Sequence, residues 1–181
     1  MHLESDYRKK ASSLSRRQLI SLWRQIVDED TPGWPPGKAF EYLVLRAFEL
    51  ERARILWPFS VKLGGHIVEQ IDGWVDVSGL SCIIESKQHA KHNDITAIAK
   101  LRNQLTRRPA STIGIVFSYS GFTIPALRLT QYVAPQTILL WAGEEVSYAL
   151  KNRKMIDGLQ RKFEYATQTG LPDYSLLAET L

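Results

Sequence analysis

Two carboxylates and a lysine that can act together fall within one short stretch of the chain: Asp72, Glu85 and Lys87. Ser78-Gly79 has the composition of a two-residue hairpin turn, and counting back from it along both strands places Asp72 opposite Glu85. Directly opposed like charges destabilise a hairpin unless a positive charge lies between them. Such a pair is a natural ligand set for Mg²⁺. Because Lys87 is two residues beyond Glu85, it shares the face of Glu85, where it can donate to an attacking water or to a phosphate. The stretch therefore predicts a site for metal-dependent phosphodiester hydrolysis.

A further carboxylate, Glu41, lies on an expected helix, with Leu45 and Phe48 four and seven residues later. It therefore borders an apolar stripe, where a carboxylate needs a partner to offset its desolvation. A metal ion is one such partner, and an exposed flank that pairs with a nearby Lys or Arg is the alternative. For the hairpin acids, the alternative is a surface hairpin with ordinary ion pairs. Glu85-Ser86-Lys87 is, however, the only acidic-x-Lys triplet in the sequence.

The elements that must position these residues follow from the hydrophobic pattern. The pattern predicts a helix over the first 30 residues with Ser15 as a cap, and a helix that Asn93 caps. The other predicted helices span residues 38–54, 123–133 and 144–166, and the predicted strands span residues 59–63, 67–77, 80–87, 112–118 and 137–141. Strands that are joined through helices pair in parallel by a right-handed crossover. We therefore expect an α/β fold with a mixed central sheet, in which three antiparallel strands precede parallel crossover strands, flanked by helices.

Alternation along the hairpin sorts its side chains into two faces. One face, expected to join the core, carries Ile71, Val75, Val77, Cys82 and Ile84. The other carries Gln70, Asp72, Trp74, Asp76, Ile83, Glu85 and Lys87. Asp76 is expected to be a surface acid of the hairpin, and a carboxylate that assists the metal is the alternative.

Length and composition limit the class of protein. The 181 residues are enough for one domain with a full core, and we expect an N-terminal helical elaboration over residues 1–36 and the main domain over residues 37–181. Hydrophobic residues at 44% and charged residues at 23% exclude a disordered chain. The single cysteine, Cys82, excludes a cysteine-based zinc site. The charged N-terminus lacks a secretory apolar stretch and no apolar run is long enough for a bilayer, so we expect a cytoplasmic protein without a membrane partner.

Positive charge is concentrated in two stretches, although the formal net charge is only +4. Residues 87–108 contain six basic residues and one acid, a balance of +5, and residues 8–24 contain six basic residues and no acid. Such stretches can follow a polyphosphate backbone, and solvated helix faces are the alternative. Lys91 and Arg107 belong to the first stretch and are candidate DNA contacts. His89 lacks the partners of a zinc site and is expected at the rim of a nucleic-acid site.

The chain resembles the PD-(D/E)xK restriction-endonuclease-like superfamily, and within it the Mrr-like endonuclease branch, over residues 37–166. The resemblance rests on Gly37-Lys-Ala-Phe-Glu41, Glu69-Gln-Ile-Asp72-Gly73, Ile84-Glu85-Ser-Lys87 and Phe117-Ser-Tyr-Ser-Gly-Phe-Thr123. It implies that Asp72 and Glu85 ligate Mg²⁺, which Mn²⁺ can replace, that Lys87 is the catalytic lysine, and that Glu41 is the acid of the preceding helix. It further implies that Gln70, Arg102 and Gln104 face the site or the DNA. Ile71 stands where the family has a proline.

These observations predict a Mg²⁺-dependent DNA endonuclease with no small-molecule cofactor. A DNA-binding module that has the same fold without catalysis is one alternative, and a structure-selective nuclease is another. A lone catalytic domain cuts both strands by pairing two copies, so we also expect a homodimer, formed through the C-terminal helix around residues 146–163.

Overall fold

The computed structural model describes residues 4–88, 91–132 and 134–178. The helices of these residues are α1 (Glu4–Ser12), α2 (Arg16–Val27), α3 (Lys38–Leu50), α4 (Ile95–Leu105), α5 (Ile124–Thr130), α6 (Gly143–Asn152) and α7 (Met155–Thr169). The strands are β1 (Arg54–Leu56), β2 (Phe59–Leu63), β3 (His66–Ile71), β4 (Gly73–Val77), β5 (Leu80–Lys87), β6 (Ile113–Ser118) and β7 (Ile138–Ala142). None of the helices in these ranges is long and apolar enough to cross a membrane.

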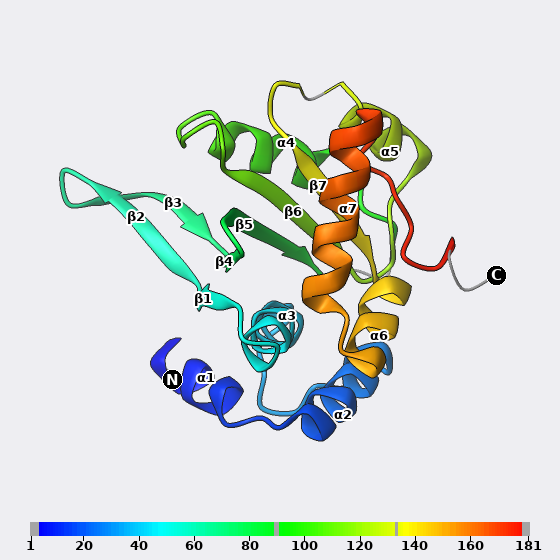
Figure 1. Cartoon of the computed structure of the whole chain (residues 1–181). Coiled ribbons are helices and arrows are strands. Elements are labelled where there is room, and N and C mark those ends of the chain that lie inside the picture. Colours follow the sequence, from blue (N-terminus) through cyan, green and yellow to red (C-terminus); the bar gives the residue numbers. More distant parts are fainter. Residues whose placement is uncertain (1–3, 89–90, 133, 179–181) are drawn as a thin grey trace.

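The central sheet has five strands in the order β1-β4-β5-β6-β7 (Figure 1). β4 is antiparallel to β1 and β5, whereas β5, β6 and β7 are parallel to one another. The parallel part arises because α4 joins β5 to β6 and α5 joins β6 to β7. The α/β class and the mixed sheet agree with the sequence prediction.

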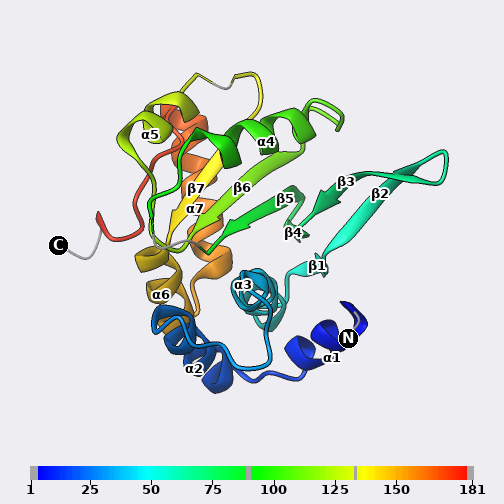
Figure 2. The ribbon, with the colours of Figure 1, turned by 180° about the vertical axis from the view of Figure 1, so that it is seen from behind.

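Helices cover both faces of this sheet, as Figures 1 and 2 show from opposite sides. On one face, Val75, Cys82, Ile84 and Phe117 join a core with α2, α3, α6 and α7. On the other face, alternate residues such as Ile83 and Val116 pack against α4 and α5. The structure therefore has two apolar layers, which is why β6 is buried along its whole length.

The predicted strand over residues 67–77 is wrong as one element, because the chain bends at Asp72 and divides it into β3 and β4. Asp72 Oδ2 accepts hydrogen bonds from the backbone N and the hydroxyl of Ser86, at 2.8 and 3.2 Å. After the bend, Gly73 packs so closely on α3 that a Cβ there would lie 2.5 Å from a methyl of Leu45. Ile71, expected with Val75 in one core, consequently lies in the opposite core.

The strand pair β2–β3 forms a separate two-stranded sheet that projects as an arm from the body (Figures 1 and 2). The prediction that residues 59–63 pair within the central sheet is therefore wrong. The short strand β1, which the sequence analysis missed, is the outer strand beside β4. Near the tip of the arm, the apolar side chains of Leu63 and Ile67 are exposed.

Several helix boundaries also differ from the prediction. The helix predicted over residues 38–54 ends at Leu50, and Arg54 begins β1. Residues 4–30 contain two helices, and Ser15 caps the second of them in a capping box with Gln18. Asp94 rather than Asn93 caps α4, since the Asn93 side chain instead donates to the Ser118 hydroxyl at 2.7 Å. The predicted last helix is divided between α6 and α7 at Arg153, which has a φ of 57°.

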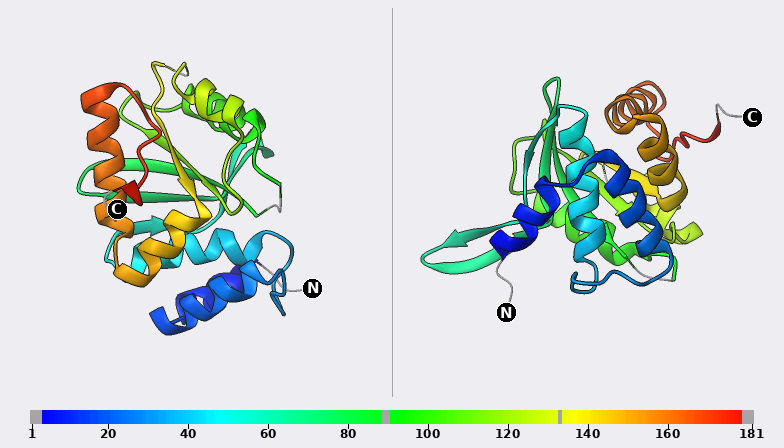
Figure 3. Two further views of the ribbon diagram at one scale, coloured as in Figure 1. Left: turned by 90° about the vertical axis from the view of Figure 1, so that its right-hand side faces the viewer. Right: turned by 90° about the horizontal axis from the view of Figure 1, so that it is seen from below.

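Figure 3 shows α2 lying beside α6 at one end of the molecule, and the two helices are in contact. Trp23 and Ile26 of α2 belong to the same core as Val146 of α6. Val146 is fully buried, so it is not available for the dimer contact expected around residues 146–163. Phe163 packs on this core but is partly exposed, and the dimer contact stays a prediction.

Candidate active site

The hairpin of β4 and β5 brings the predicted acids together at one end of β5. Val77 pairs with Leu80 and Gly73 with Ile84, as the predicted turn requires. Asp72 and Glu85 are the next residues outward on the two sides of this ladder. Their negative charges interact, and this interaction contributes to a raised pKa of Asp72.

The carboxylate of Glu85 is completely buried, and two lysines reach it. Lys87 Nζ lies 2.5 Å from Oε1, and Lys100 Nζ, from α4, lies 2.5 Å from Oε2. The Lys87 contact confirms that both residues are on the same face of β5. Each oxygen of the buried carboxylate therefore already has an ammonium group beside it.

Lys87 is a charged donor in this arrangement. Burial is the largest influence on its pKa and lowers it, but the hydrogen bond and charge of Glu85, with smaller contributions from Asp72 and Glu41, outweigh burial and raise the pKa. The side chain is therefore an ammonium group at neutral pH. It can donate hydrogen bonds and stabilise negative charge, but it is not available as a base.

Asp72 lies against the backbone of the Glu85-Ser86-Lys87 triplet. Burial raises its pKa first, and the neighbouring charge of Glu85 raises it further, while the hydrogen bond from the Ser86 backbone opposes both. A carboxylate with a raised pKa next to a second carboxylate is stabilised in its charged form by added positive charge.

Glu41 reaches the same cluster from α3, with 11% of its side chain exposed. Lys38 Nζ donates to its Oε1 at 2.9 Å. Burial, and next the charge of Asp72, raise the pKa of Glu41 to about 7. The helix therefore packs beside the hairpin as expected. Glu41 has a lysine partner but is buried and not on an exposed flank, and its interpretation as a metal ligand stays a prediction.

The resemblance implies that the carboxylates of this cluster bind a divalent cation. Among residues 4–88, 91–132 and 134–178, no group of three or more His, Cys, Asp and Glu side chains is arranged to hold a metal ion. Glu41, Asp72 and Glu85 are thus neighbours rather than a preformed three-ligand site. Asp72 and Glu85 supply the carboxylate oxygens that a hard cation prefers, and their charges disfavour each other. Because Lys87 and Lys100 lie at the two oxygens of Glu85, an ion that binds Glu85 would displace at least one of these lysines.

The predicted DNA contacts are divided between the surface and the interior. Gln70, Lys91 and Arg102 are exposed. Gln104 is buried, with 5% exposed, and donates from Nε2 to the backbone oxygen of Gln70 at 3.2 Å. Its side chain therefore joins α4 to β3 and does not lie on the surface expected for DNA. His89 lies outside the described residues.

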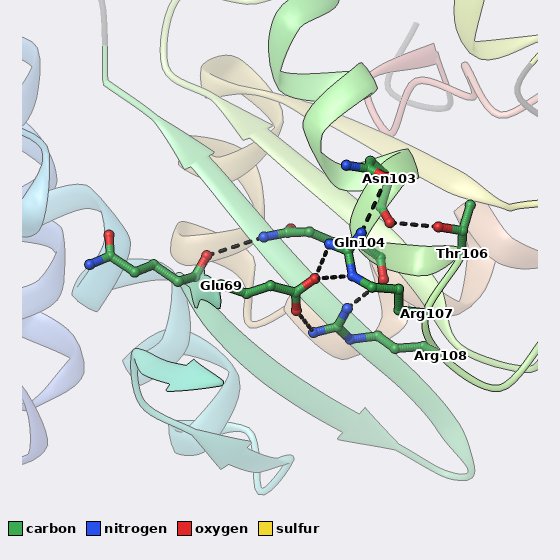
Figure 4. Close-up of polar contacts among 7 residues, drawn as sticks. Glu69, Asn103, Gln104, Thr106, Arg107 and Arg108 are labelled. Atoms are coloured by element: carbon green, nitrogen blue, oxygen red, sulfur yellow. Dashed lines mark hydrogen bonds and ion pairs between the residues drawn. The ribbon is translucent and has the colours of Figure 1, made fainter. Parts of the chain in front are cut away.

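Arg107 is also engaged in a contact within the protein (Figure 4). Its Nε donates to Glu69 Oε1 at 2.5 Å, and Arg108 Nη2 donates to Oε2 of the same carboxylate at 2.7 Å. These contacts attach the base of the β2–β3 arm to the end of α4. Charge counting suggested Arg107 as a free DNA contact because the sequence does not show that Glu69 lies beside it.

Lys100 is a site residue that the sequence does not predict. It belongs to the basic stretch of residues 87–108, but a separation of fifteen residues from Glu85 does not reveal the contact between them. The signal in the sequence is weak: α4 must cover the face of β5 that carries Ile83 and Glu85, and Lys100 precedes the buried Leu101 on that helix.

Comparisons with known proteins add little to this description. No family model and no curated protein matches the chain. A partial match among solved structures is titled "Crystal Structure of Protein of Unknown Function AF1548", with a TM-score of 0.47 and 16% sequence identity. The match covers 56% of this chain and 56% of that chain.

Proposed function

We propose that this protein is a Mg²⁺-dependent deoxyribonuclease that cuts phosphodiester bonds within DNA. The observation that carries the proposal is the buried cluster at the end of β5, where Asp72, Glu85 and Lys87 meet Glu41 and Lys100. Buried carboxylates whose charges oppose one another are costly to maintain for stability alone. Their grouping is typical of sites that perform chemistry.

Each side chain has a distinct role in this proposal. Asp72 and Glu85 hold the cation, which when bound lowers the pKa of a coordinated water and neutralises charge on the phosphate. The Lys87 ammonium group donates to a non-bridging phosphate oxygen and stabilises charge that develops there. Since the pKa of Glu41 is about 7, its carboxyl oxygen can take up a proton near neutral pH.

A DNA substrate is supported by exposed positive charge on the elements that follow β5. Lys91 and Arg102 are exposed, the first on the segment after β5 and the second on α4. Exposed cationic groups bind a phosphate backbone by displacing counterions. The resemblance to the PD-(D/E)xK superfamily supports the same substrate.

The test is incubation of the purified protein with supercoiled plasmid and linear DNA, with Mg²⁺, with Mn²⁺ and with EDTA. We expect cleavage that requires the ion and is lost in Asp72→Asn and Lys87→Met. Asp76→Asn is the matched control, because Asp76 lies on the same hairpin but pairs with Arg54 at 3.5 Å. Cleavage that persists in EDTA, or that is equal in Lys87→Met and the wild type, would contradict the proposal.

A DNA-binding module without catalysis is the second candidate. It is favoured by the two lysines that already neutralise Glu85, because such pairing stabilises the cluster without a metal. This candidate predicts salt-dependent DNA binding and no cleavage with either ion. If cleavage occurs on branched DNA and not on linear duplex, the protein is instead a structure-selective nuclease.

We also propose that the protein is cytoplasmic. We propose further that it acts as a homodimer, because one catalytic centre cuts one strand at a time. Light scattering at micromolar concentration tests the dimer. A monomeric mass together with full double-strand cleavage would contradict it.

A further inference from the structure

A cavity of about 600 Å³ lies at the end of α3 that is away from the carboxylate cluster. Glu51 and Arg52 line it and directly follow the C-terminal end of α3, whereas Glu41 lies in the first turn of this helix. Other walls come from Arg16 at the start of α2 and from Arg153 between α6 and α7. These four helices meet in this part of the molecule (Figure 1). A helix rises about 1.5 Å per residue, so roughly 14 Å of α3 separates Glu41 from the end that borders the cavity.

Three arginines from separate segments line this cavity: Arg16, Arg52 and Arg153. Arg16 is held in place, because its Nη2 donates to the backbone oxygen of Leu150. Among the residues that the structure describes, the guanidinium groups of Arg52 and Arg153 have no hydrogen-bond or ion-pair partner. The N–H donors of these two groups are therefore available to a ligand from outside the protein.

The two carboxylates that also line the cavity, Glu51 and Asp157, are already engaged. Glu51 accepts hydrogen bonds at 3.1 and 3.0 Å from the first two backbone N–H groups of α7, one at each carboxylate oxygen. Asp157 Oδ2 lies 3.0 Å from Arg161 Nε. Because both carboxylates satisfy other groups, positive charge remains in excess on the walls of the cavity.

The charges of the arginines disfavour one another. Burial lowers the pKa of Arg16, the charge of Arg153 lowers it further, and the charge of Glu51 opposes these two effects only in part. An added anion stabilises like positive charges that are held close together.

The backbone at two of these positions favours glycine over arginine. Arg52 follows α3 with a φ of 73°, and Arg153 follows α6 with a φ of 57°, both in the left-handed region that disfavours a side chain. The residue that follows α7 in the same conformation is Gly170. Arginine at both positions therefore costs backbone strain, which is concentrated at binding sites in proteins. Cations also complement the dipole at a helix C-terminus, and anion binding distinguishes the two explanations.

The chemistry of the lining selects phosphate as the ligand group. Every cation among the described residues of the lining is an arginine, and none is a lysine. The planar guanidinium group presents paired N–H donors that match two oxygens of one phosphate. A volume of about 600 Å³ is within the range of about 300–1,000 Å³ for small-molecule sites and exceeds the space that a single phosphate fills. A ligand with more than one phosphate can therefore contact several arginines at once.

We propose that this cavity binds a ligand that carries more than one phosphate group, and that Arg16, Arg52 and Arg153 hold these groups. The site is separate from the carboxylate cluster, so the proposal does not rest on the nuclease function. The phosphates can belong to a free compound, such as a nucleoside diphosphate, or to the backbone of a bound DNA strand, because both present the same anionic oxygens.

Isothermal titration of the purified full chain with pyrophosphate tests the proposal, without divalent metal and at an ionic strength fixed with KCl. We expect saturable binding in the wild type that weakens by about tenfold or more in Arg52→Gly and in Arg153→Gly. Glycine is the residue that the left-handed backbone favours, so both variants are expected to fold, which circular dichroism checks. Asn also tolerates this conformation, and Arg52→Asn or Arg153→Asn replaces a glycine variant that does not fold.

The matched control is Arg17→Ala. Arg17 is exposed on α2 beside Arg16 and is not among the residues that line the cavity, so this variant loses the same charge without changing the site. It is expected to bind pyrophosphate as the wild type does.

A second titration separates the two sources of the phosphates, with a fluorescein-labelled DNA duplex followed by anisotropy. Weaker pyrophosphate binding in the glycine variants with unchanged duplex affinity assigns the site to a free compound. Weaker duplex binding in the same variants, and not in Arg17→Ala, assigns it to the DNA backbone. Absence of saturable binding of both probes, or affinities in the glycine variants equal to that of Arg17→Ala, would overturn the proposal and leave the arginines with a role at the helix C-termini alone.

Discussion

The carboxyl group of Glu41 is expected to make the folded protein less stable as the pH rises from 4.5 to about 7. Burial and the charge of Asp72 raise the pKa of Glu41 from 4.5 to about 7. Between these two values the folded chain binds this proton more tightly than the unfolded chain, so the free energy of unfolding falls as pH increases. A shift of one pKa unit corresponds to about 1.36 kcal/mol. Above pH 7, ionisation of Glu41 therefore lowers the free energy of unfolding by about 3 kcal/mol relative to the protonated carboxyl.

Replacing Glu41 with Gln removes this cost because the amide does not ionise. In EDTA, Glu41→Gln is expected to raise the free energy of unfolding by about 3 kcal/mol near pH 8 and to change it little near pH 4. Urea unfolding across this pH range measures the difference between the two proteins. The matched control is Glu49→Gln on the same helix, since Glu49 pairs with Arg46 at 2.5 Å and is outside the cluster. Its curve is expected to stay parallel to that of the wild type.

The reasoning is refuted if Glu41→Gln and the wild type have the same pH dependence. It is also refuted if the variant is less stable than the wild type near pH 8, because the hydrogen bond from Lys38 would then outweigh burial and the charge of Asp72.

Three further predictions concern other charged groups. Lys162 is 1% exposed, and its Nζ lies 2.6 Å from Glu145 Oε1. Lys162→Met is therefore expected to lower the free energy of unfolding, measured in urea, by about 3–5 kcal/mol, because it leaves the Glu145 charge buried without its partner. Adding Glu145→Gln should restore part of this loss, and no restoration would argue against the pair. Lys100→Met leaves Glu85 with one lysine and is expected to lower the free energy of unfolding by about 1–2 kcal/mol. This loss is smaller than for a fully buried pair because the Lys100 side chain is 42% exposed. If the loss persists in a Glu85→Gln background, the contact is not its cause. Glu69→Gln weakens the attachment of the β2–β3 arm to α4 and should increase amide hydrogen exchange in β3 without changing β6; unchanged exchange in β3 would contradict the role assigned to Figure 4.

The parts of the fold that local patterns determine were predictable. The turn at Ser78-Gly79 sets the register that pairs Val77 with Leu80. The capping box of Ser15 and the face shared by Glu85 and Lys87 follow from spacing alone. In each case the residues that decide the structure are neighbours in the sequence or across a two-residue turn.

The parts that depend on distant contacts were not predictable. The bend at Asp72 depends on the Ser86 backbone, fourteen residues away, and on the packing of Gly73 against α3. Similarly, the role of Lys100 depends on how α4 docks on β5, and the burial of Gln104 depends on the position of β3. Periodicity reports which face of an element is apolar, but it does not report which polar groups of another element will meet it.

Direct measurement of divalent cation binding tests the central claim most directly. Isothermal titration of the purified protein with Mn²⁺ near pH 8 is compared between the wild type, Asp72→Asn and Asp76→Asn. Our account predicts saturable binding in the wild type and in Asp76→Asn, and loss of that binding in Asp72→Asn. Absence of binding in the wild type, or equal binding in all three proteins, would contradict the claim that Asp72 and Glu85 hold a cation.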